Sequence, residues 1–335
     1  MKVKYMIFAF GILPLVFLLT ITSYFAAFAI TVMTGGVNVL ETDTAMVNQG
    51  IFNIIRYTLI IVICGWVYYR SFMQDSYSSS DTKKIIKHVI CPVNLLMIIT
   101  IGACIQFATD AVLYILGTLL PESFTSYSAM INEYKGNPSI LFIATTVLLA
   151  PFAEELIFRG LILKFARKSL EVETNTNEKA KETKKDTKKE STQNAKKEIK
   201  KDTPKEIKEE AKQEGKNKSK EKSIKFDTNK KAQMIAIIIQ AVLFALYHGN
   251  LIQICYALIF GILFGIIAVK FNSLVPSTLI HMVVNGTLYL IPDSFFENIP
   301  YACAVFAVAF ILLIFTYVMF LKSHKHLSSV ESHLD

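Results

Sequence analysis

Long apolar stretches separated by short polar segments dominate the chain. A helix needs about 20 mainly apolar residues to cross a hydrocarbon core of about 30 Å. About eight stretches have that length, and they predict membrane-spanning helices at roughly residues 7–33, 51–69, 89–116, 139–163, 232–248, 252–269, 274–291 and 300–321. The first stretch is too long for a removable signal peptide and has no convincing cleavage motif. The pattern therefore predicts an all-α fold, a polytopic bundle of about eight transmembrane helices.

The composition agrees with a membrane protein, except in one strongly charged segment. Hydrophobic residues make up 53% of the chain and charged residues 19%. Residues 171–231 alone hold 20 Lys and 14 acidic residues, a net of +6 out of the +8 of the whole chain. The basic balance is therefore a property of one insert, and it gives no argument for a nucleic-acid partner. The partners expected are membrane lipid and a peptide or protein substrate.

The charged insert, residues 169–231, is rich in Lys and Glu and contains Lys-Lys-Glu and Lys-Glu-Thr units. It has too few apolar residues to offset the entropy of ordering, so it is expected to be a disordered or transiently helical, solvated spacer. The alternative is a polybasic segment that contacts lipid, and the interleaved acids weaken that alternative.

The distribution of Lys and Arg between loops predicts the orientation in the membrane, because basic residues of short loops stay in the cytoplasm. With the N-terminus inside, nearly all of them fall on the cytoplasmic side. The exceptions are Lys135 and Arg56. We therefore expect an integral, multi-pass membrane protein whose N-terminus, C-terminus and 169–231 insert are cytoplasmic.

The fourth predicted span contains three ionisable residues, Glu154, Glu155 and Arg159. Ionisable residues are costly in a bilayer and are commonly functional there. Consecutive helical residues point about 100° apart, so the two carboxylates cannot face the same way. Glu155 and Arg159 are spaced to pair along one face, which leaves Glu154 free to face something else. The alternative is that the helix has already reached the headgroups at this point.

Two later spans carry further polar groups. His248 closes the fifth span, and His281 and Asn285 lie four residues apart on one face of the seventh. Counted along ideal helices, His248 lies one to two turns nearer the outer side than the others. A helix tilt, an earlier start of the fifth helix, or a cavity that reaches past the midplane would remove this mismatch.

These motifs, in this order and each within an apolar span, resemble the CPBP family of intramembrane proteases. That family includes CAAX-processing enzymes and the bacterial Abi proteins linked to bacteriocin processing and immunity. The matching residues are Glu154, Glu155 and Arg159, then Phe244 and His248, then His281 and Asn285. The resemblance implies a catalytic core over 138–168 and 232–291, preceded by three transmembrane helices over 1–137 and followed by a last helix and tail over 292–335.

The resemblance implies an endopeptidase, and its site residues suit hydrolysis at a polar cavity. Glu154, assisted by His248, would activate a water, while His281 and Asn285 would donate to the oxyanion. No cofactor is favoured, because Asn is a poor zinc ligand. The alternative is a zinc ion held by Glu154, His248 and His281. The substrate expected is a peptide or protein, with lipid modification one of the options.

Two other classes fit parts of the pattern. A non-catalytic scaffold or bacteriocin-immunity protein of the same family would use the polar residues to join helices. A transporter would use them as a proton relay, but the internal repeat that many transporter folds contain is absent from the sequence.

Overall fold

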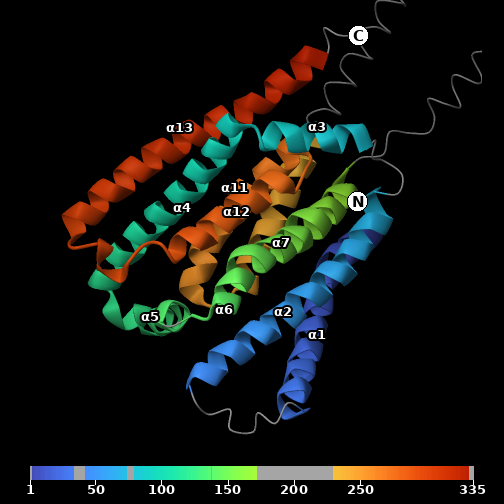
Figure 1. Ribbon diagram of the computed structural model, residues 1–335. Coiled ribbons are helices and arrows are strands. Elements are labelled where there is room, and N and C mark those ends of the chain that lie inside the picture. The colour runs from blue at the N-terminus through green and yellow to red at the C-terminus, as the bar shows by residue number, and fades with distance from the viewer. Residues whose placement is uncertain (1, 34–41, 74–78, 137, 172–228, 332–335) are drawn as a thin grey trace, which may run out of the picture.

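The computed structural model describes residues 2–33, 42–73, 79–136, 138–171 and 229–331, and within them it confirms the all-α fold (Figure 1). The described residues contain no strand. Their helices are α1 (Val3–Met33), α2 (Thr42–Tyr68), η1 (Tyr69–Met73), α3 (Ser79–Val89), α4 (Pro92–Leu119), α5 (Pro121–Gly136), α6 (Ile140–Ala144), η2 (Thr145–Leu149), α7 (Ala150–Glu155), η3 (Leu156–Ile162), α8 (Leu163–Leu170), an unlabelled helix Asn229–Tyr247, α11 (Leu251–Phe271), α12 (Val275–Leu288), η4 (Asp293–Phe295) and α13 (Ile299–Glu331).

Seven of the eight predicted spans correspond to helices in the described residues that are long and apolar enough to cross a membrane. The chain is therefore an integral membrane protein. The exception is the predicted span 274–291, because the helix that the structure shows there is shorter than predicted. Its helix, α12, has only 14 residues, or about 21 Å at 1.5 Å per residue. Seven of those residues are buried, so α12 is an internal helix packed among the others.

The close packing of α12 on α4 depends on one glycine. A Cβ atom built on Gly102 of α4 would lie 2.6 Å from the side chain of Val283 on α12. Because real Cβ atoms do not approach that closely, only glycine permits this helix pair to meet as it does. The contact holds the polar face of α12, with His281 and Asn285, at a fixed distance from α4.

The helix ends that the charge distribution assigns to one side of the membrane do lie together. The backbone N–H of Lys2 donates to the carbonyl of Ser169 over 2.9 Å, and His88 Nε2 lies 3.3 Å from Ser323 Oγ. Figure 1 shows the start of α1, the end of α13 and helix α3 at the same end of the bundle. That this end faces the cytoplasm stays a prediction.

The opposite end of the bundle is crossed by α5, a helix between α4 and α6 (Figure 1). Lys135 Nζ, near the end of α5, donates to the carbonyl of Ile291 after α12 over 2.8 Å. The ring of Tyr127 packs against that of Tyr256 on α11, with 6.4 Å between centroids. These contacts hold α5 against α11 and against the segment that follows α12.

The predicted insert overlaps ordered helix at both ends. Helix α8 continues to Leu170, and the next helix begins at Asn229, so residues 169–170 and 229–231 are helical. The remainder of the predicted insert, from 172 to 228, lies outside the described residues.

Candidate active site

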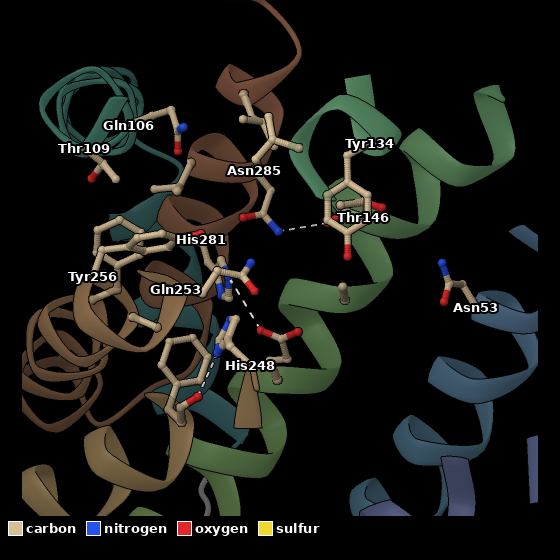
Figure 2. A pocket seen from close by; sticks show the side chains of 18 of the residues that line it. Asn53, Gln106, Thr109, Tyr134, Thr146, His248, Gln253, Tyr256, His281 and Asn285 are labelled. Carbon is tan, nitrogen blue, oxygen red and sulfur yellow. Dashed lines mark hydrogen bonds and ion pairs between the residues drawn. The ribbon is translucent and has the colours of Figure 1, made fainter. Parts of the chain in front are cut away.

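A polar cavity of about 220 Å³ lies among the central helices. Four of the six predicted site residues line it: Glu154, His248, His281 and Asn285. They come from α7, from the turn after helix Asn229–Tyr247, and from α12, and Figure 2 shows the two imidazoles and the carboxamide converging from one side. The cavity thus reaches both His248 and the other three residues, although the sequence placed His248 nearer the outer side of the membrane.

Glu154 and Glu155 point to different environments, as their adjacent positions on a helix require. Glu154 lines the cavity, whereas Glu155 is fully buried and does not. Nη1 of Arg159 lies 3.0 Å from Oε1 of Glu155 in an ion pair whose two side chains are wholly shielded from solvent. The predicted pairing of Glu155 with Arg159 is confirmed, and Glu154 is left to the cavity.

The guanidinium of Arg159 is held mainly by rings and by charge. Its central carbon lies 4.3 Å from the ring centroid of Phe244 and 5.3 Å from that of Phe264. Although Nη1 is close to Glu155, none of the three guanidinium nitrogens has a hydrogen-bond partner among the described residues. Arg159 therefore supplies the positive charge that balances buried Glu155. Its contact with the Phe244 ring gives a physical role to the Phe of the Phe244/His248 motif.

His281 lies between the two carboxylates. Its Nδ1 is 3.2 Å from Glu155 Oε1, and its Nε2 is 3.8 Å from Glu154 Oε2. Because a carboxylate paired with arginine can only accept, Nδ1 carries the proton that it shares with Glu155. A neutral His281 then presents a lone pair at Nε2, and only the imidazolium presents an N–H to the cavity.

His248 has a defined tautomer for a similar reason. Its Nδ1 lies 2.8 Å from the carbonyl of Phe244, one turn earlier in the same helix. A carbonyl only accepts, so Nδ1 donates and the lone pair of the neutral ring is on Nε2. The helix ends at this point, and Asn250 caps the start of α11 by accepting from the N–H groups of Ile252 and Gln253. His248 is thus able to accept a proton from within the cavity.

The position of Asn285 depends on an irregular backbone opposite it. Helix α7 is flanked by the π-helical segments η2 and η3, and the N–H of Ala150 bonds to the carbonyl of Thr145, five residues earlier. In that register the carbonyl of Thr146 would pair with residue 151, but Pro151 has no N–H. Asn285 Nδ2 donates to this carbonyl over 3.0 Å (Figure 2). One amide N–H of Asn285 remains for a ligand.

Several cavity residues were not predicted, and most come from helices outside the motifs. They are Gln49, Asn53, Arg56 and Tyr57 on α2, Gln106 and Thr109 on α4, Tyr127 and Tyr134 on α5, and Gln253 and Tyr256 on α11. Spacing offers a partial signal, because polar residues at 49, 53 and 56 recur on one face of a membrane span. Outside the spans, burial raises the pKa of the Tyr134 hydroxyl, which keeps it a neutral donor.

The predicted zinc ligands are not arranged as a preformed metal site. Among the described residues, no three His, Cys, Asp or Glu side chains are grouped closely enough to hold one ion. The set Glu154, His248 and His281 does not fit zinc in this geometry, although all three line the same cavity.

Carboxylate, imidazole and carboxamide groups around one internal cavity are the kinds of side chain that hydrolytic enzymes use as bases and hydrogen-bond donors. Residues 136–287 match the family model described as type II CAAX prenyl endopeptidase Rce1-like. This match confirms, over that segment, the resemblance drawn from its motifs. No curated protein and no solved structure matched the chain.

Proposed function

We propose that the protein is an intramembrane endopeptidase that hydrolyses peptide bonds with a water activated by Glu154. The observation that supports this most strongly is the convergence of Glu154, His248, His281 and Asn285 on one cavity from three separate segments. The family match over 136–287 supports a protease in general. The substrate is a peptide or a protein segment that enters from the membrane or from its surface.

In this mechanism Glu154 removes a proton from a water in the cavity, and the resulting hydroxide attacks the carbonyl carbon of the scissile bond. Glu154 then passes the proton to the leaving amine, so that one water is consumed and no proton is gained or lost. His248, with its Nε2 lone pair, accepts a hydrogen bond from the same water and orients it. Shielding from bulk water strengthens each of these interactions.

The tetrahedral oxyanion receives two hydrogen bonds. One comes from the remaining amide N–H of Asn285, whose other N–H is bound to the carbonyl of Thr146. The second comes from Nε2–H of His281 in its imidazolium form, because Glu155 already accepts from Nδ1. Glu155 and Arg159 act as positioning residues: they hold the imidazole without touching the substrate.

The test is the replacement Glu154→Gln in the full chain reconstituted in lipid vesicles. The change is nearly isosteric, so the protein should fold and insert normally and lose peptide hydrolysis by several orders of magnitude. Glu133→Gln on α5 is the matched control, because Glu133 is exposed and does not line the cavity. Substrates are sought by comparing the peptides of cells that carry the native chain with those of cells that carry the variant. Identical peptide profiles would reject the protease and favour a non-catalytic membrane scaffold.

Chelation distinguishes a metal-free enzyme from a zinc enzyme. The proposed mechanism predicts full activity after chelators have removed all divalent ions. It also predicts that Asn285→Ala lowers the rate by about 10²–10³-fold, as expected when an oxyanion donor is lost. Stoichiometric zinc in active, chelator-washed protein would overturn the metal-free mechanism.

A further inference from the structure

Arg56 is a charged side chain in a membrane span that the proposed chemistry does not use. It lies on α2, within the candidate span Gln49–Phe72, and lines the same cavity as Glu154. A guanidinium is effectively always charged and is costly to place at membrane depth. Such a residue requires an anion, a ring or a strong acceptor near it.

The partners of Arg56 in the structure satisfy only part of its capacity. It donates to the hydroxyl of Tyr57, and its central carbon lies 4.3 Å from the Tyr57 ring and 5.6 Å from the Phe52 ring. Within the part of the chain that the structure describes, its buried Nε has no hydrogen-bond partner. Among the described residues, no carboxylate oxygen lies within 4.0 Å of its nitrogens. A guanidinium has five N–H donors, so several remain for a ligand.

Other polar side chains beside Arg56 on α2 also face the cavity and could bind a ligand there. Gln49 and Asn53 lie two turns and one turn before Arg56 on α2, and all three line the cavity. Figure 2 shows Asn53 on the side of the site opposite His248 and His281. A ligand held by α2 would therefore lie between this polar face and the proposed hydrolytic groups. Residue 56 lies outside the segment 136–287 that matches the family.

The charges in the cavity indicate which ligand would be accepted. Glu154 repels a second carboxylate that enters the same space of low polarity. Arg56 supplies the compensating positive charge, and its planar N–H groups match a carboxylate in a bidentate pair. A peptide carries this group at its C-terminus or on Asp and Glu side chains.

We propose that Arg56, flanked by Asn53 and Gln49, binds a carboxylate of the peptide substrate and so selects for peptides with a negative charge near the scissile bond. The claim that this ligand is a substrate rests on the proposed function. The two sources of the carboxylate, chain terminus and side chain, share the same recognition chemistry and are distinguished by experiment.

The experiment measures binding separately from cleavage. Pools of fluorescent octapeptides are made in pairs, with a C-terminal acid or a C-terminal amide, and are titrated by anisotropy against the full chain carrying Glu154→Gln in vesicles. The acid pool should bind roughly 10- to 100-fold more tightly than the amide pool, as expected for hydrogen bonds to a charged group. Adding Arg56→Gln should remove this difference, and Arg56→Lys should retain part of it.

A second pair of pools identifies the source of the carboxylate. Both are amidated at the C-terminus, and they differ by Asp or Asn at a single internal position. Tighter binding of the Asp pool that depends on Arg56 assigns a side-chain carboxylate, and tighter binding of the C-terminal acid assigns the chain terminus. Arg167→Gln is the control for loss of a cation, because Arg167 pairs with Glu171 on the surface of α8 and does not line the cavity.

Equal or undetectable binding of all four pools to the Glu154→Gln chain would overturn the carboxylate subsite. This comparison needs no change at Arg56, so it holds even if Arg56→Gln destabilises the fold. If binding depends on Arg56 but the native chain cleaves none of the peptides, the carboxylate subsite stands and the proposed hydrolysis is rejected.

Discussion

At the scale of single residues, the adjacent carboxylates of Glu154 and Glu155 lie in different surroundings. Glu155 is buried with Arg159 and His281, whereas Glu154 reaches the cavity. A buried ion pair contributes little net stability, but the loss of one partner leaves an uncompensated charge. The roles of the two neighbours are therefore separable by mutation.

We expect Arg159→Ala to destabilise the protein by about 3–5 kcal/mol, because Glu155 would be left buried without its cation. The change also removes a fully buried side chain that packs on Phe244 and Phe264. Glu154→Gln should cost much less, since no cation lies within 4.0 Å of Glu154 apart from His281 at 3.8 Å, among the described residues. Thermal unfolding in detergent measures both.

The control for Arg159→Ala is the double variant Glu155→Gln/Arg159→Leu, which removes both charges and keeps an acceptor for Nδ1 of His281. It should recover a substantial part of the lost stability, because no unpaired charge remains. Equal melting temperatures for Arg159→Ala and Glu154→Gln would contradict the structural role assigned to the Glu155–Arg159 pair.

At the scale of elements, the irregular helix formed by η2, α7 and η3 determines the geometry of the site. A π-helical segment adds a residue to a turn and often marks a functional position. Here the π register combines with Pro151 to expose the carbonyl of Thr146, which Asn285 binds. The proline thus acts on Asn285 through the backbone, without contact with a substrate.

Replacement of Pro151 by Ala separates this effect from stability. The new N–H would compete with Asn285 for the carbonyl of Thr146, so we expect peptide hydrolysis to fall by roughly 10-fold, less than the 10²–10³-fold expected for loss of an oxyanion donor. The melting temperature should stay equal or rise, because proline is a poor residue inside a helix. Steady-state kinetics and thermal unfolding provide the two measurements.

Pro14→Ala is the matched control, since Pro14 lies inside α1 and does not line the cavity. It should leave hydrolysis unchanged. Full activity of Pro151→Ala with an intact fold would show that Asn285 does not need the freed carbonyl.

At the scale of the whole molecule, the described residues form a bundle of seven candidate membrane spans around the short internal helix α12. The ends of α8 and α1 meet through the hydrogen bond from Lys2 to Ser169. Residues 172–228 connect α8 to the helix that begins at Asn229, and all the described residues that line the cavity lie outside this segment.

We therefore expect activity to survive replacement of residues 172–228 by a Gly/Ser linker of about 15 residues, whose ends lie on average roughly 20 Å apart. Hydrolysis of the same peptide by the native and shortened chains in vesicles tests this. A chain of full length with a scrambled insert is the control for length. Loss of activity in the shortened chain, with normal insertion into the membrane, would assign the insert a recruiting or regulatory role.

Much of the site was accessible from the sequence because each motif lies within an apolar span, where polar residues are conspicuous. Glu154, His248, His281 and Asn285 were found in this way, and all four line the cavity. Arg56 and Gln106 were not, although both also interrupt apolar helices. They belong to no recognised motif, and a polar residue in a span does not show which cavity it faces.

The length of α12 could not be predicted, because its residues are as apolar as those of a spanning helix. Hydropathy measures the preference for an apolar environment, and both lipid and a protein interior provide one. The two environments differ only in what surrounds the helix, which here includes α4 and its Gly102.

The sequence by itself determined the helical membrane class, the order of the motifs, and the pairing of Glu155 with Arg159, because hydropathy and helical periodicity are local properties. Only the tertiary structure decided that α12 is internal, that α2 and α4 contribute Arg56 and Gln106 to the cavity, and that Thr146 offers its carbonyl to Asn285. These features depend on contacts between segments distant in the chain, and such contacts arise from the packing of whole helices.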